Sequence, residues 1–139
     1  MHIKKLQEIQ KNGHIKGFID NGPAKNFNVI KTKSVQKDWL SYNLNYWANK
    51  HQLQIESEYK FLVDRRFRFD WCLPGIKVAI EYEGIFNKGN NGHTGITGFL
   101  DDVEKYNEAT VLGYRILRCT AHDYKNILRL LDRIILQYK

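Results

Sequence analysis

Two short stretches decide the fold: residues 66–71 read RFRFDW and residues 77–83 read KVAIEYE. In both, apolar residues alternate with charged or small ones, a period of two that is typical of half-buried β-strands. Pro74 and Gly75 lie between the two stretches and indicate a turn. The sequence therefore predicts a β-hairpin at the centre of the chain.

The length of the connecting loop decides which residues face one another across this hairpin. If residues 73–76 close it, the opposed residues on one face form three pairs: Asp70–Ala79, Arg68–Glu81 and Arg66–Glu83. The apolar residues then share the opposite face: Phe67, Phe69, Trp71, Val78, Ile80 and Tyr82. Because a Pro-Gly pair is not a favoured two-residue turn, a longer loop stays open. An even change of register would preserve both faces, whereas a slip by one residue would mix them.

Patterns on both sides of the hairpin predict the remaining elements. Ser34 is expected to cap a helix that runs to about Lys50, and residues 55–63 read as a strand. Residues 84–98 contain five glycines and read as a long loop. A helix, a strand and a closing helix are expected to follow, over residues 99–112, 114–119 and 122–137. The predicted fold class is α/β, with a mixed central sheet flanked by helices.

Length and composition restrict the possible classes of protein. A chain of 139 residues, with 42% hydrophobic and 13% aromatic residues, favours one globular domain. We interpret residues 1–33 as a basic N-terminal arm or extension and residues 34–139 as the α/β domain. The two cysteines, Cys72 and Cys119, are too few for a disulfide scaffold or a four-thiolate zinc site. No apolar run resembles a signal peptide or a membrane span, so we expect a cytoplasmic protein without a membrane partner.

Charge is distributed unevenly along the chain. Lysine and arginine number 22 against 15 acidic residues, a net charge of +7. Residues 1–55 hold nine basic and three acidic residues, whereas residues 56–139 hold thirteen and twelve. A basic segment beside a nearly neutral body indicates a polyanionic partner, and nucleic acid is the first candidate. The aromatic residues of the first predicted helix are expected to pack in the core rather than to stack on bases: Trp39, Tyr42, Tyr46 and Trp47.

Three carboxylates gather on the polar face of the predicted hairpin. Glu81 and Glu83 lie two residues apart on one strand, about 6.6 Å along it, and Asp70 lies on the neighbouring strand. Clustered carboxylates repel one another unless a cation lies among them, and their oxygens suit Mg²⁺ or Mn²⁺. The alternative is a face without a metal, on which Arg66 and Arg68 form cross-strand ion pairs with the two glutamates.

At this point the residues resemble a known family. The stretches RFRFDW (66–71) and KVAIEYEG (77–84) look like the core of the PD-(D/E)XK nuclease superfamily. The resemblance continues through GHT (92–94), DVEKYNEA (102–109) and GYRILR (113–118), and covers roughly residues 34–135. Within the superfamily, the chain is similar to small phage-encoded endonucleases that are related to virus-type replication-repair nucleases and very short patch repair endonucleases.

The resemblance implies a restriction-endonuclease-like core and a metal-dependent DNA endonuclease that uses Mg²⁺ or Mn²⁺. By position, Asp70 would be the metal-binding aspartate and Glu81 the acidic ligand of the second half of the motif. Glu58 would be an upstream acidic residue that assists the metal or its water. Phe69 stands where the motif has proline, and Glu83 stands where it expects lysine. Glu83 is therefore interpreted as either an additional metal ligand or the sign of a different mechanism.

Lys105 is the candidate for a lysine that has moved to another element. On a helix over residues 99–112, the predicted apolar stripe contains Phe99, Val103, Tyr106 and Ala109. Lys105 lies at the edge of that stripe, from which a long side chain could extend along the sheet towards the carboxylates. The alternative is a surface lysine that pairs with Asp101 or Glu108 on its own helix.

Further residues are candidates for contacts with DNA. His93, in the glycine-rich loop, could act as a general acid or contact phosphate, and Lys88 is a second phosphate contact in that loop. Arg65, Arg66 and Arg68 are expected to follow the DNA backbone together with the basic N-terminal arm.

Two other functions stay open. One is a catalytically inactive nucleic-acid-binding protein on the same fold, suggested by the missing lysine; the other is a basic structural protein whose carboxylates pair with arginines. Within the enzyme interpretation, the substrate could be a Holliday junction, a nicked or mismatched duplex, or a specific duplex site. A junction resolvase or a palindrome cutter would require a homodimer, for which the sequence shows no clear surface.

Overall fold

The computed structural model describes residues 34–84 and 95–138. Its helices are α2 (Val35–Lys50), α3 (Ile96–Val111) and α4 (Ile127–Ile135), and its strands are β1 (Glu56–Lys60), β2 (Arg68–Leu73), β3 (Val78–Glu83) and β4 (Arg115–Thr120). Short 3₁₀ turns at Pro74–Ile76, Tyr124–Asn126 and Leu136–Tyr138 complete these elements. The expected order of elements is confirmed, although β1, β3 and the closing helix are shorter than the sequence pattern indicates, and β2 and β4 are shifted along the chain.

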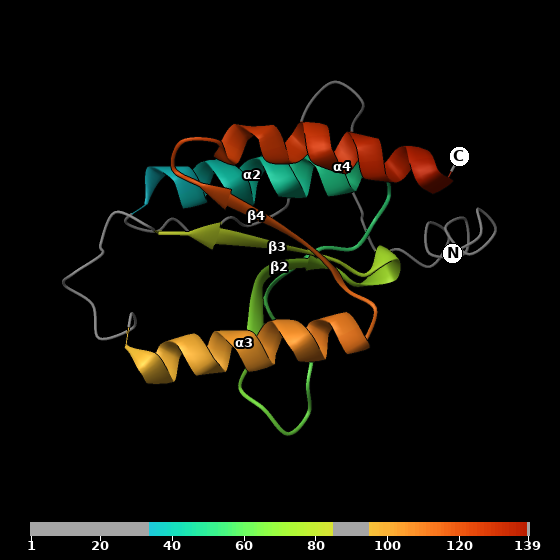
Figure 1. Ribbon diagram of the computed structural model, residues 1–139. Helices are drawn as coiled ribbons and strands as arrows, with labels where there is room; N and C mark the ends of the chain where they lie inside the picture. Colours follow the sequence, from blue (N-terminus) through green and yellow to red (C-terminus); the bar gives the residue numbers. More distant parts are fainter. Residues whose placement is uncertain (1–33, 85–94, 139) are drawn as a thin grey trace.

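The four strands form one mixed sheet in the order β1-β2-β3-β4. The first three are antiparallel neighbours, whereas β3 and β4 are parallel and are joined through α3. Figure 1 shows α2 and α4 side by side on one face of the sheet and α3 on the other. The sequence prediction of an α/β fold with a mixed sheet between helices is therefore confirmed. Within residues 34–84 and 95–138, no helix is long and apolar enough to cross a membrane.

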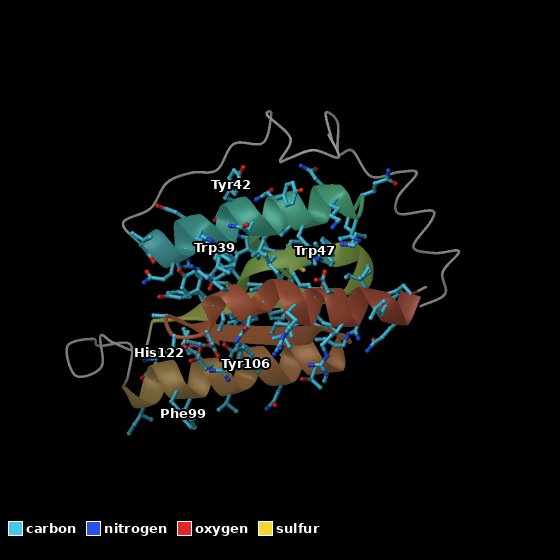
Figure 2. All side chains as sticks on the ribbon, turned by 90° about the horizontal axis from the view of Figure 1, so that it is seen from above. Trp39, Tyr42, Trp47, Phe99, Tyr106 and His122 are labelled. Carbon is cyan, nitrogen blue, oxygen red and sulfur yellow. The ribbon has the colours of Figure 1, made fainter. Side chains whose placement is uncertain are left out.

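Helix α2 begins where the sequence predicts. The Ser34 hydroxyl accepts a hydrogen bond from the Lys37 N–H over 3.2 Å, which satisfies one of the unpaired donors of the first turn. The helix packs its buried residues against α4 and the sheet, and Trp47 Nε1 donates to Asp132 Oδ1 over 2.8 Å. Figure 2 shows Trp39 and Trp47 turned towards α4, whereas Tyr42 points outward. Trp39 and Trp47 are thus packing residues, as expected, whereas the expectation is wrong for Tyr42, 44% of which is exposed.

The central hairpin has the longer of the two loops considered above. Residues 74–76 form a 3₁₀ turn, and Lys77 follows in the left-handed region with φ 51°. The observed partners are Trp71–Ile80, Cys72–Ala79 and Leu73–Val78, a shift of two residues from the first register. Since the shift is even, the carboxylates stay on one face, and Asp70 now falls opposite Glu81.

The predicted apolar face of the hairpin is wrong at Phe69. Trp71 and Leu73 pack towards α2 and α4, whereas Phe69 belongs to the second core, under α3. The change of face falls at Asp70. In the register of β1 with β2, Asp70 lies opposite Glu58, whose φ is 49°. The left-handed residue interrupts the regular pairing of β1 with β2 at this point, and strict alternation along β2 does not continue through it.

The predicted apolar stripe of α3 is also wrong in its first half. Ala109 is buried, but 65% of Phe99 and 42% of Val103 are exposed, together with Ile96 and Leu100. Figure 2 shows Phe99 pointing away from the body of the domain. The face of α3 that meets the sheet instead carries Lys105, Tyr106 and Ala109. The helix ends at Val111, and Gly113 follows with a φ of 86°, a backbone conformation that favours glycine.

Two clusters of buried side chains hold the layers together. The larger lies between the sheet and the α2–α4 layer and includes Leu40, Leu44, Trp71, Ile80 and Leu131. The smaller lies on the α3 side and consists of Phe69, Cys72, Ala79 and Ala109, with Tyr59, Phe61, Tyr114 and Ile116 packed against it. Both cysteines are free and buried.

Candidate active site

Asp70 and Glu81 bridge β2 and β3 through their side chains. Backbone pairing of the two strands extends to Trp71 and Ile80. At the next position, the Asp70 N–H donates to Glu81 Oε2 over 3.0 Å. In return, the Tyr82 N–H donates to Asp70 Oδ2 over 2.8 Å. These reciprocal bonds hold the two carboxylates beside one another beyond the paired part of the hairpin.

Helix α3 adds a lysine to these carboxylates. The Lys105 ammonium donates to Glu81 Oε1, and only 13% of the lysine side chain and 6% of the glutamate side chain are exposed. The Tyr106 hydroxyl lies 3.5 Å from the same oxygen. The Lys105 nitrogen also lies 5.7 Å from the centre of the Phe69 ring, so apolar surface encloses the pair on one side. Lys105 thus contacts Glu81 rather than Asp101 or Glu108 on its own helix.

Burial dominates the electrostatics of this pair. It raises the pKa of Glu81 above its ordinary value, and the negative charge of Asp70 acts in the same direction. The hydrogen bond and charge of Lys105 oppose both effects. Burial and the charges of Glu81 and Glu83 also raise the pKa of Tyr106, whose hydroxyl is a hydrogen-bond donor at neutral pH. A proton donor and a cation therefore both point at the one buried carboxylate.

Glu83 forms an ion pair with Arg118, a residue that the sequence pattern does not single out. Arg118 of β4 donates from Nε to Glu83 Oε1 over 2.8 Å. Its guanidinium lies 5.1 Å from the centre of the Tyr106 ring, and the hydrogen bond to Glu83 raises the pKa of Arg118. The only sequence signal for this contact is the expected strand over residues 114–119, which does not specify a partner.

The alternative of an ion-paired hairpin is wrong in its partners. In the part of the chain that the structure describes, the three ion pairs are Arg65–Glu104, Lys105–Glu81 and Arg118–Glu83. Arg66 and Arg68 are exposed and pair with neither glutamate. The carboxylates of β3 are therefore neutralised from α3 and β4, not from β2.

The other candidate residues lie at different distances from this centre. Glu58 is exposed on β1, opposite Asp70 in the strand register. Both terminal nitrogens of Arg65 bind Glu104 of α3, over 2.6 and 2.9 Å, so its guanidinium is engaged within the protein. Arg66 and Arg68 remain available to a partner. His93 and Lys88 lie outside the described residues.

Two of the three expected metal ligands come together. Among residues 34–84 and 95–138, no group of three histidine, cysteine or acidic side chains could hold a metal ion. Asp70 and Glu81 nevertheless present hard oxygen ligands side by side, and no donor from the described residues bonds to Asp70 Oδ1. Since Mg²⁺ is commonly held by one or two carboxylates together with water and substrate phosphates, Asp70 and Glu81 fit such an ion. Glu83, bound to Arg118, is not part of this pair.

The chain was compared with known families, proteins and structures. No protein-family model matches the sequence, and no curated protein and no solved structure is significantly similar to it.

Proposed function

We propose that this chain is a metal-dependent DNA endonuclease with a restriction-endonuclease-like core, which hydrolyses phosphodiester bonds. The observation that carries the proposal is the meeting of Asp70, Glu81 and Lys105, from β2, β3 and α3, at one place on the sheet. Two carboxylates and an ammonium group suit hydrolysis of a phosphodiester, which requires a bound cation, an activated water and stabilisation of negative charge.

The arrangement of strands supports the same proposal. The PD-(D/E)XK resemblance implies an α/β core with a mixed sheet flanked by helices, and the chain has a mixed sheet of this kind between α2, α4 and α3. The resemblance places the acidic residues at positions 70 and 81. Glu81 accepts the Asp70 N–H and Asp70 accepts the Tyr82 N–H, so these two carboxylates lie beside one another. It leaves the motif lysine unassigned, and Lys105 brings an ammonium group to Glu81 from α3.

In the proposed reaction, one water adds to the phosphorus and the bond to the 3′ oxygen breaks. Asp70 and Glu81 would hold Mg²⁺ or Mn²⁺, which supplies Lewis acidity and lowers the pKa of water when bound. Lys105 would orient the attacking water or donate a hydrogen bond to an oxygen on which charge develops. For this it must leave Glu81 Oε1. Phe69 and Tyr106 limit the space around the ammonium group and so keep it within reach of the substrate.

A catalytically inactive nucleic-acid-binding protein is the second candidate, because Glu83 occupies the position of the motif lysine. Both candidates predict DNA binding that weakens steeply with salt. They differ in turnover that depends on a divalent metal.

A cleavage assay separates them. The protein is incubated with Mg²⁺ or Mn²⁺ and with supercoiled plasmid, single-stranded DNA or a four-way junction. Asp70→Ala and Glu81→Ala are run beside Glu56→Ala, a matched control in which an exposed carboxylate of β1 is removed. We expect cleavage by the wild type and by the control, and none by the two site variants. Binding without cleavage of every substrate would support the inactive candidate instead.

A further inference from the structure

Arg118 is the exposed cation beside the candidate active site. In the parallel pairing of β3 with β4, Arg118 is the register partner of Glu81. Paired residues on neighbouring strands point to the same face of a sheet, so Arg118 emerges on the face that carries Glu81. More than half of its side chain, 56%, is exposed, compared with 13% of Lys105. A ligand that reaches this face from solvent therefore meets Arg118 before it meets the lysine.

Two contacts fix the position of the guanidinium. Glu83 accepts a hydrogen bond from Nε, and the ring of Tyr106 lies beneath the guanidinium plane at 5.1 Å. A guanidinium has five N–H donors, and its terminal nitrogens form no hydrogen bond with residues 34–84 or 95–138. The outward part of the group is thus oriented by its neighbours and open to a further acceptor.

The charges of the site require such a cation. Asp70, Glu81 and Glu83 place three carboxylates near one another, and a polyanion that approaches them is repelled. Lys105 is buried against Glu81 and compensates only that charge. The arginine is suited to the remaining task, because its planar fork matches the two oxygens of a phosphate and binds them through paired hydrogen bonds.

The contact with Glu83 can be exchanged at little cost. The Arg118–Glu83 pair is partly exposed, with 56% and 31% of the two side chains open to solvent. Exposed pairs contribute little to stability because water competes for both partners. A phosphate that approaches the guanidinium can therefore replace the Glu83 carboxylate without disturbing the fold.

We propose that Arg118 binds a backbone phosphate of the substrate beside the cleaved bond, and that Glu83 is its counter-ion when no substrate is bound. The identity of the substrate rests on the function proposed above, whereas the placement of Arg118 and Glu83 does not. Glu83 in this arrangement pairs with the arginine of the free protein rather than binding a metal.

The test is the salt dependence of DNA binding, measured without divalent metal so that cleavage plays no part. Affinity for a short duplex is measured from low to moderate salt for the wild type, Arg118→Ala, Arg118→Lys and Arg129→Ala. The last is the matched control, because Arg129 is an exposed arginine on α4, on the other face of the sheet. Glu83→Gln is measured alongside.

Arg118→Ala is expected to weaken binding and to reduce the slope of log affinity against log salt by about 0.9, the loss of one phosphate contact. Arg118→Lys keeps the slope and weakens binding, because it keeps the charge and loses the fork. Glu83→Gln strengthens binding, and Arg129→Ala leaves the slope unchanged. A circular dichroism spectrum and a thermal melt confirm that each variant is folded.

The results distinguish the phosphate contact of Arg118 from the proposed nuclease activity. If Arg118→Ala has the same slope of log affinity against log salt as the wild type, Arg118 does not bind a phosphate, even if the protein cleaves DNA. A reduced slope in a protein that never cleaves supports the phosphate contact and contradicts the nuclease. If the wild type does not bind DNA at all, both proposals fall.

Discussion

Lys105 and Glu81 form an ion pair that joins α3 to the carboxyl-terminal half of β3, with 13% and 6% of the two side chains exposed. The same glutamate accepts the Asp70 N–H of the neighbouring strand. One carboxylate thus ties two strands and a helix together. Because charges are costly to bury without a partner, the integrity of the site and of the fold depend on the same contact.

The first prediction concerns this pair. Lys105→Met leaves the Glu81 charge buried without its cation and is expected to lower the free energy of unfolding by about 3 kcal/mol. The double variant Lys105→Met/Glu81→Gln removes the charge while keeping an acceptor for the Asp70 N–H. It should be more stable than the single lysine variant. Urea unfolding of the wild type, both single variants and the double variant gives the coupling energy. Strictly additive losses would mean that the two groups do not interact.

The second prediction distinguishes three neighbouring arginines. Both terminal nitrogens of Arg65 bind Glu104, whereas Arg66 and Arg68 are exposed and have no carboxylate partner among the described residues. Arg66→Ala and Arg68→Ala are therefore expected to weaken DNA binding more than Arg65→Ala. Fluorescence anisotropy with a labelled duplex measures all three. An equal loss for Arg65→Ala would show that the Glu104 contact opens when DNA binds.

The third prediction tests the two phenylalanines that the sequence pattern misplaces. Phe69 is fully buried under α3, and its ring lies 4.2 Å from that of Phe61. Phe69→Ala should cost about 3–5 kcal/mol, the usual range for a buried phenylalanine. Phe99, on the outer side of α3, is 65% exposed, and Phe99→Ser should change stability by no more than about 0.5 kcal/mol. Chemical denaturation measures both, and a large loss for Phe99→Ser would place that ring in a contact.

The fourth prediction concerns the thiols. Cys72 is 0% and Cys119 2% exposed, and burial raises the pKa of each to about 12. Since the thiolate is the reactive form, neither cysteine should react with a disulfide reagent at pH 8 in the folded protein. Both should react after unfolding in denaturant. Rapid modification of one thiol in the native protein would reveal local opening at that strand.

Much of this fold can be predicted from local patterns. The Ser34 cap and the alternation in β3 depend on residues close in sequence, and both are observed. Asp70 and Glu81 lie on the same face in the register first considered and in the observed one, because the longer loop shifts the pairing by two residues. Side chains repeat every two residues along a strand, so an even shift leaves the face unchanged.

What could not be predicted depends on contacts between distant residues. The change of face between Phe69 and Trp71 lies beside a left-handed residue on the neighbouring strand, Glu58, and no local pattern in β2 signals it. The exposure of Phe99 depends on which side of α3 meets the sheet, and the helix carries apolar residues on both sides. Arg118 reaches Glu83 through parallel pairing across a crossover, a register that no local pattern in either strand encodes.

The role of Asp70 in metal-dependent cleavage is tested with the variant Asp70→Asn. This variant removes the charge of Asp70 and keeps an oxygen to accept the Tyr82 N–H, so the hairpin should stay folded. The single-turnover cleavage rate in Mg²⁺ and the affinity for the same DNA are measured side by side with the wild type. We expect that Asp70→Asn loses cleavage while its affinity for DNA stays close to that of the wild type. Cleavage at the wild-type rate by Asp70→Asn would contradict the proposed active site.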